Sequence, residues 1–156
     1  MSTAILEYKY KGQATEAAAG NPISEITIHS KANILDLEAE IESARSILKL
    51  PDNWDGEGSP RYSERTFERA IAFARMHIKH LWEASGITAP IPRINPGPMG
   101  SIDLHWKQST WEMLVNISAN ETQPASFYGD DYGAGVIKGT VDTGQPNFGL
   151  LEWLMK

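Results

Sequence analysis

The chain has 156 residues, of which 41% are hydrophobic and 22% are charged, and its formal net charge is −6. This length and composition fit one globular domain and exclude a chain that is disordered throughout. The absence of cysteine excludes disulfides, iron–sulfur clusters, thiolate metal sites and cysteine nucleophiles. Scattered basic residues and an acidic balance argue against direct nucleic-acid binding.

The first residues do not resemble an export signal. Glu7, Lys9 and Lys11 interrupt the apolar run that a signal peptide needs. No segment approaches the roughly 18 consecutive apolar residues of a membrane span. We therefore expect a cytoplasmic protein that makes no contact with membranes.

We interpret residues 1–156 as a single domain, in which residues 1–30 are an N-terminal extension and residues 31–156 are the main body. Weak alternation over residues 1–10, and again around Ile26, favours two short strands in the extension. A linker of small residues separates them and ends at a Gly-Asn-Pro breaker.

Two amphipathic helices are predicted next, over residues 32–50 and 63–84. Ser30 and Ser63 are the candidate N-caps, and Gly86 is the expected stop of the second helix. Apolar residues recur at three- and four-residue steps in both segments, which indicates one buried stripe on each helix. The stripes comprise Ile34, Leu37, Ile41, Ala44, Ile47 and Leu48 in the first helix, and Phe67, Ala70, Ile71, Ala74, Ile78, Leu81 and Trp82 in the second. Arg69 is expected on the solvent side.

Beyond residue 88 the pattern changes from helix to strand. Residues 89–100 carry four prolines, which exclude a helix and favour an edge position. The hydrophobic period then becomes two, so Ile102, Leu104 and Trp106 are expected to face the core while the residues between them face outward. A four-residue turn leads to a second alternating strand with Trp111, Met113, Val115 and Ile117 on its apolar face.

Further strands are predicted near Ser126–Tyr128 and Val136–Val141, and a helical pattern returns at Phe148–Met155. Runs of helix followed by runs of strand are typical of α+β proteins. The sequence therefore predicts an α+β fold, with an antiparallel β-meander of about three to five strands packed against two main helices, and a short C-terminal helix.

The loop PDNWDGEGSP at residues 51–60 is the most unusual segment. Its oxygen-bearing side chains and glycines partly match a calcium-binding loop, with candidate ligands Asn53, Asp55, Glu57 and Glu64. The match lacks Asp at its first position, and Asx turns joining two helices account for the same residues. We therefore predict a structural loop that holds neither a metal nor another cofactor, with Trp54 packed on the core.

Three other constellations are weaker. His77 and His80 lie three residues apart on a predicted helix but lack a third metal ligand. Asp103 and His105 share one face of a predicted strand, where a carboxylate could orient a base, but no nucleophile accompanies them. The glycine-rich run at residues 129–135 lacks the Lys-Ser/Thr ending of a phosphate-binding loop. No catalytic or cofactor-binding residue is assigned.

Five tryptophans are many for a small core. Aromatic side chains anchor protein interfaces, so a surplus of them favours a binding surface. The candidate interaction residues are Trp54, Trp111, Tyr128 and Tyr132.

The segment from Leu48 to Trp106 contains the motif NWDGEG, an amphipathic helix, a proline-rich stretch and the strand IDLHW. It resembles a loose group of small uncharacterised bacterial proteins that share an NWDGxG loop and an IxLxW strand. The resemblance implies a phage or mobile-element setting and transfers no activity. His105 stands where the group more often has an acidic residue, and Glu57 where it more often has an aromatic one.

The leading hypothesis is a non-enzymatic protein–protein interaction module that acts as an antitoxin, inhibitor or accessory factor of a mobile element. Its partner would be another protein. Two alternatives stay open. One is a metal-dependent hydrolase that uses the acidic residues at 52–57. The other is a self-associating structural protein, which would form a homo-oligomer.

Overall fold

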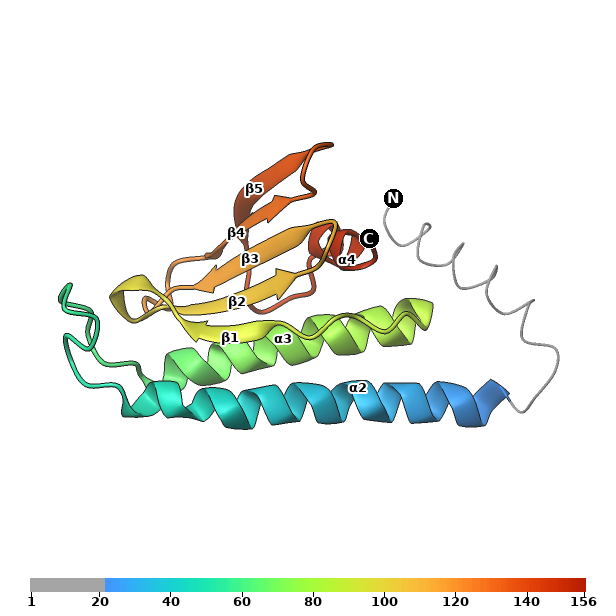
Figure 1. The fold of residues 1–156 in the computed structure, drawn as a ribbon, viewed down its shortest axis with the longest axis horizontal. Coiled ribbons are helices and arrows are strands. Elements are labelled where there is room, and N and C mark those ends of the chain that lie inside the picture. The colour runs from blue at the N-terminus through green and yellow to red at the C-terminus, as the bar shows by residue number, and fades with distance from the viewer. Residues whose placement is uncertain (1–21) are drawn as a thin grey trace.

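The computed structural model describes residues 22–156, and their side chains from residue 33 onward. Two long helices lie side by side along one face of a five-stranded antiparallel sheet (Figure 1). The elements are α2 (Pro22–Ala44), η1 (Arg45–Lys49), α3 (Glu64–Ser85), β1 (Arg93–Pro96), η2 (Pro98–Gly100), β2 (Ile102–Lys107), β3 (Glu112–Ile117), β4 (Ala125–Asp130), β5 (Val136–Val141) and α4 (Phe148–Leu154). The strands neighbour one another in chain order, so the predicted α+β fold is confirmed. Among the helices in residues 22–156, none combines the length and apolar character needed to cross a membrane.

The N-terminal half of α2 corrects the sequence prediction. The helix begins at Pro22, so the strand expected around Ile26 is wrong and Ser30 lies inside the helix instead of capping it. Proline suits the first helical turn because its missing N–H has no helical partner there. The strand predicted over residues 1–10 lies outside the described residues. Towards its other end α2 follows the prediction, since it passes into η1 and stops before Pro51.

Local signals set both ends of α3, as predicted. The Ser63 hydroxyl accepts a hydrogen bond from the Thr66 N–H at 3.1 Å, and Gly86 adopts a left-handed φ of 67°. The predicted apolar stripe is buried except for Trp82, which is half-buried. On α2 the stripe is buried from Leu37 to Ile47, but Ile34 is 49% exposed.

The predicted register of the sheet is confirmed. Ile102, Leu104 and Trp106 are buried against the helices, while the residues between them are half-buried or exposed. On β3 the buried residues again alternate. The Trp106 indole N–H donates to the Pro90 carbonyl oxygen at 2.9 Å, so this large side chain is buried without leaving its polar atom unpaired.

Helix α4 packs on the inner face of the sheet near β4. Gly129 permits this approach, because a Cβ atom there would lie 2.9 Å from Trp153 Cε2 and 3.0 Å from Ile137 Cγ1. Asn147 caps α4 through its side chain, and its backbone N–H donates to His77 Nε2 on α3 at 3.0 Å. The buried imidazole of His77 therefore connects α4 to α3.

His77 should make stability depend on pH. Its Nδ1 lies 2.9 Å from the Phe73 carbonyl oxygen, and its Nε2 accepts from Asn147, so the neutral ring fits both partners. Burial, and to a smaller extent the nearby His80, lower the pKa of His77 below its usual value. The unfolded chain therefore binds the proton first, and the contribution of this group, complete above about pH 6.5, is lost as the pH falls.

Urea unfolding between pH 8 and pH 5 measures this effect. We expect the free energy of unfolding to fall more steeply with decreasing pH in the wild type than in His77→Gln, which lacks the titrating ring. Equal pH slopes for the two proteins would contradict the assignment.

Candidate functional site

The outer face of the sheet carries the most extensive set of exposed polar and aromatic side chains. Alternate residues of each strand point away from the helices, and the strand register aligns them in rows across the sheet. The rows are Arg93–His105–Leu114–Tyr128–Lys138, Asn95–Asp103–Asn116–Ser126–Thr140 and Lys107–Glu112–Asp130–Val136. Such a one-sided antiparallel sheet buries one face and leaves the other available for contacts.

Two tyrosines and two carboxylates form the distinctive part of this face. Tyr128 and Tyr132 are 41% and 47% exposed. The Tyr128 hydroxyl donates to Asp130 Oδ2 at 3.3 Å, and the Tyr132 backbone N–H donates to Asp130 Oδ1 at 2.8 Å. We call Tyr128, Tyr132, Glu112 and Asp130 the tyrosine–carboxylate corner.

The electrostatics of the corner follow from this arrangement. Partial desolvation, followed by the Asp130 carboxylate, raises the pKa of the Tyr128 phenol. Desolvation, followed by Glu112 and Asp130, raises the pKa of Tyr132 in the same way. Both phenols therefore stay neutral at ordinary pH, and the rings stand beside negative charge. Aromatic faces next to carboxylates suit a cationic side chain such as arginine, which can stack and pair at once.

Asp103 and His105, which share one face of β2 as expected, each pair with a residue of β3. His105 Nε2 lies 3.0 Å from Glu112 Oε2 on the neighbouring strand. Asp103 instead accepts from Asn116 Nδ2 at 2.7 Å, and burial raises the pKa of its carboxyl group. Asn116 lies directly opposite Asp103 in the register of β2 and β3, whereas Glu112 is the diagonal neighbour of His105. Both partners therefore lie within reach across the two strands.

The acidic loop between η1 and α3 directs its oxygens to its own backbone. Asp52 Oδ1 accepts from the Arg61 N–H and Asn53 Oδ1 from the Gly58 N–H, each at 2.7 Å. Asp55 Oδ1 accepts from the Glu57 N–H at 3.0 Å. The glycines at 56 and 58 adopt positive φ, as expected for a sharp reversal. Within residues 22–156, no group of three or more histidine, aspartate or glutamate side chains is arranged to hold a metal ion.

Two tryptophan predictions need correction. Trp54 is 38% exposed instead of packed on the core, and its indole N–H donates to the Tyr62 hydroxyl at 3.2 Å. Tyr62 anchors the loop in its place, since it is buried and donates to the Gly97 carbonyl oxygen at 2.6 Å. Trp111 is only 3% exposed, so it belongs to the core and not to a binding surface.

We expect chelation to leave the stability of the loop unchanged. Because its oxygens accept backbone hydrogen bonds, EDTA should not shift the melting temperature. Asp55→Ala should lower it, because it removes two hydrogen bonds from backbone N–H groups and one from the Ser59 hydroxyl. Trp54→Ala should lower the melting temperature by less than the loss of a buried tryptophan would. A rise of several degrees on adding calcium would contradict this account.

The histidines on α3 have separate surroundings. Both ring nitrogens of His77 are engaged by protein atoms, whereas the His80 ring meets Phe148 edge-on with centroids 5.8 Å apart. The two rings therefore do not present their nitrogens to a common ligand.

The glycine-rich run at residues 129–135 forms the end of β4 and the loop before β5. In this loop Asp131 Oδ1 accepts hydrogen bonds from the Ala134 and Gly135 N–H groups.

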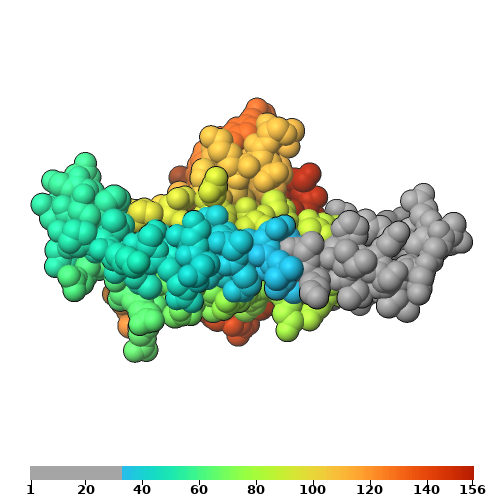
Figure 2. All heavy atoms as spheres, turned by 60° about the horizontal axis from the view of Figure 1, so that its bottom comes forward, coloured from blue at the N-terminus to red at the C-terminus, as the bar shows by residue number. Residues whose placement is uncertain are grey.

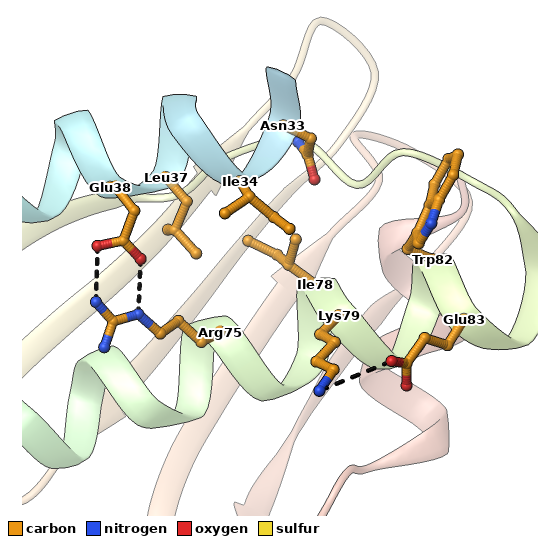
Figure 3. Close-up of a pocket in the computed structure, with 9 residues that line it drawn as sticks. All are labelled: Asn33, Ile34, Leu37, Glu38, Arg75, Ile78, Lys79, Trp82 and Glu83. Carbon is orange, nitrogen blue, oxygen red and sulfur yellow. Dashed lines mark hydrogen bonds and ion pairs between the residues drawn. The ribbon is translucent and has the colours of Figure 1, made fainter. Parts of the chain in front are cut away.

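A groove lies between α2 and α3 (Figure 3). It has a volume of about 250 Å³, and Ile34, Leu37, Ile78 and Trp82 supply its apolar lining. The charges around it pair with one another: Arg75 forms two hydrogen bonds with Glu38, at 2.8 and 2.7 Å, and Lys79 lies 3.7 Å from Glu83. Figure 2 views the molecule from the side on which α2 lies outermost, with the acidic loop projecting at one end. The groove offers room for an apolar side chain but few free polar groups.

Comparison of the chain with protein-family models, with curated proteins and with solved structures gives no match.

Proposed function

We propose that this chain is a non-enzymatic protein-binding module whose contact surface is the outer face of the sheet, centred on the tyrosine–carboxylate corner. Its partner is a protein that presents arginine or lysine side chains to Tyr128 and Tyr132. The setting that best suits such a module is cytoplasmic, as an antitoxin, inhibitor or accessory factor.

The single observation that carries the proposal is the exposure of two tyrosine rings beside Glu112 and Asp130 on the outer face. Tyrosine provides a large amphipathic contact area with little loss of conformational entropy, which is why it recurs at interfaces. The two carboxylates add charge complementarity towards a basic partner and would accelerate its association.

The alternative of a metal-dependent hydrolase receives less support. Its candidate residues Asn53 and Asp55 already accept hydrogen bonds from the loop backbone, so ligating a metal would require breaking them. His105, the candidate base, is paired with Glu112 and is not oriented by Asp103.

The test is affinity capture from the source cells, with the recovered partner identified and its affinity measured on purified proteins. Tyr128→Ala and Tyr132→Ala should each weaken binding by about tenfold or more, since interface tyrosines are often hot spots. Higher salt should slow association.

Leu35→Ala is the control, because Leu35 is a large exposed side chain on α2, away from this face, and at 59% is more exposed than either tyrosine. It should leave the affinity unchanged. Recovery of no stoichiometric partner, or equal losses for Leu35→Ala and the tyrosine variants, would overturn the proposal.

A further inference from the structure

The two edge strands of the sheet, β1 and β5, differ in whether other residues protect their free backbone groups. At β1, the Glu40 carboxylate on α2 accepts from the Ile94 backbone N–H at 2.9 Å, and Pro92 and Pro96 flank that residue without backbone donors. These devices block the pairing of a further strand at that edge.

Among the described residues, β5 has neither a proline nor a side chain from another element that accepts from its backbone N–H groups. Within residues 22–156, the backbone of Val136–Val141 forms hydrogen bonds with β4 alone. The strand stands at the outer limit of the sheet, away from α2 and α3 (Figure 1). Its side chains are mostly exposed, and Val136 is 57% exposed. An exposed edge strand with β-branched residues and no proline is a template for pairing with another strand.

One charge on β5 and one directly after it favour a second copy of the same strand as the occupant. Lys138 lies on β5, Asp142 directly follows its last residue, and both are exposed. The two residues are four apart, so they point to the same face when the extended backbone of β5 continues through Asp142. In an antiparallel pair of two β5 strands centred on Thr140, Lys138 of each copy lies directly opposite Asp142 of the other. A two-fold axis thus forms two identical ion pairs from a single sequence, which is the self-complementarity that an isologous dimer requires.

We propose that the chain forms a two-fold symmetric dimer by antiparallel pairing of β5 with β5 of a second copy, in the register that sets Lys138 opposite Asp142. The sheet then continues across both copies. Because paired residues in an antiparallel sheet point to the same side, the two outer faces form one surface with both tyrosine–carboxylate corners on it. This dimer goes beyond the proposed partner binding and does not depend on it.

Sedimentation equilibrium of the purified protein over a concentration series tests the proposal. The wild type should dimerise reversibly. Lys138→Asp places two carboxylates opposite each other at both ends of the pair, and Asp142→Lys places two ammonium groups there. Each single variant should raise the dimer dissociation constant by at least about tenfold, because like charges directly opposite destabilise strand pairing.

The double variant Lys138→Asp/Asp142→Lys restores opposite charges in the same register and should recover most of the affinity. Mixing the two single variants should also give a dimer, since one supplies only acidic and the other only basic side chains. Lys79→Asp, an identical charge change on the exposed side of α3, is the control and should have no effect. Asp142→Asn keeps the acceptor for the Gly144 N–H and should weaken the dimer less than Asp142→Lys.

A wild type that stays monomeric at every concentration overturns the proposal. So does a dimer that the single variants do not weaken, or a double variant as weak as the singles. Circular dichroism of each variant establishes that it is folded. The assay uses the purified chain alone, so its result is independent of partner capture by Tyr128 and Tyr132.

Discussion

Replacing Ile71 by aspartate is expected to cost more than about 4 kcal/mol of the free energy of unfolding, enough to unfold many domains of this size. Ile71 is fully buried on the apolar stripe of α3. A carboxylate there has either to stay ionised without a partner or to be protonated at a cost, and the apolar contacts of the isoleucine are lost in both cases.

The control is the same substitution one position later. Ala72 is exposed on α3, so Ala72→Asp should lower the free energy of unfolding by less than about 1 kcal/mol, mainly through helix propensity. Urea unfolding followed by circular dichroism measures both variants. Similar losses at the two positions would mean that the apolar stripe of α3 does not face the core.

Trp106→Ala is the second substitution with a large expected effect. It should lower the free energy of unfolding by about 3 to 5 kcal/mol. Trp106 is the largest of the fully buried side chains, and truncation leaves a cavity between β2 and the helices that the packed surroundings cannot fill. The substitution also removes the donor for the Pro90 carbonyl oxygen.

Trp106→Phe separates these two contributions. Phenylalanine keeps an aromatic ring in the core but lacks the indole N–H. The substitution should therefore lower the free energy of unfolding by about 1 to 2 kcal/mol. Thermal and urea unfolding of both variants give the comparison. If phenylalanine proved as destabilising as alanine, the hydrogen bond to Pro90, and not the packing, would dominate at this position.

The helix α3 and strands β2 and β3 were predictable because their signals are local and repeated. The apolar residues of α3 recur at helical spacing over about four turns, from Phe67 to Trp82, and Ser63 and Gly86 act on the backbone within a few residues. In β2 and β3 the period of two leaves only one register that buries the tryptophan and aliphatic side chains. The N-terminal half of α2 lacked such a stripe, so brief alternation around Ile26 was mistaken for a strand.

The candidate site was only partly predictable. Tyr128 and Tyr132 were expected to be exposed aromatic residues and are, but the sequence did not place Glu112 beside them. Trp111 was counted as a surface residue, although its position in the alternating pattern of β3 assigned it to the core. Arg69 was expected to face solvent, yet its guanidinium donates to the Ser118 carbonyl oxygen at 2.9 Å.

By itself the sequence determined the α+β class, the central elements and the inner and outer faces of the sheet, because periodicity and capping act within one segment. Only the tertiary structure decided which outward residues became neighbours. The rows across the sheet depend on the register of each hairpin, and the closure of the β1 edge depends on Glu40, which lies 54 positions before Ile94. Contacts between residues so far apart in sequence are fixed when the core packs, and no local pattern encodes them.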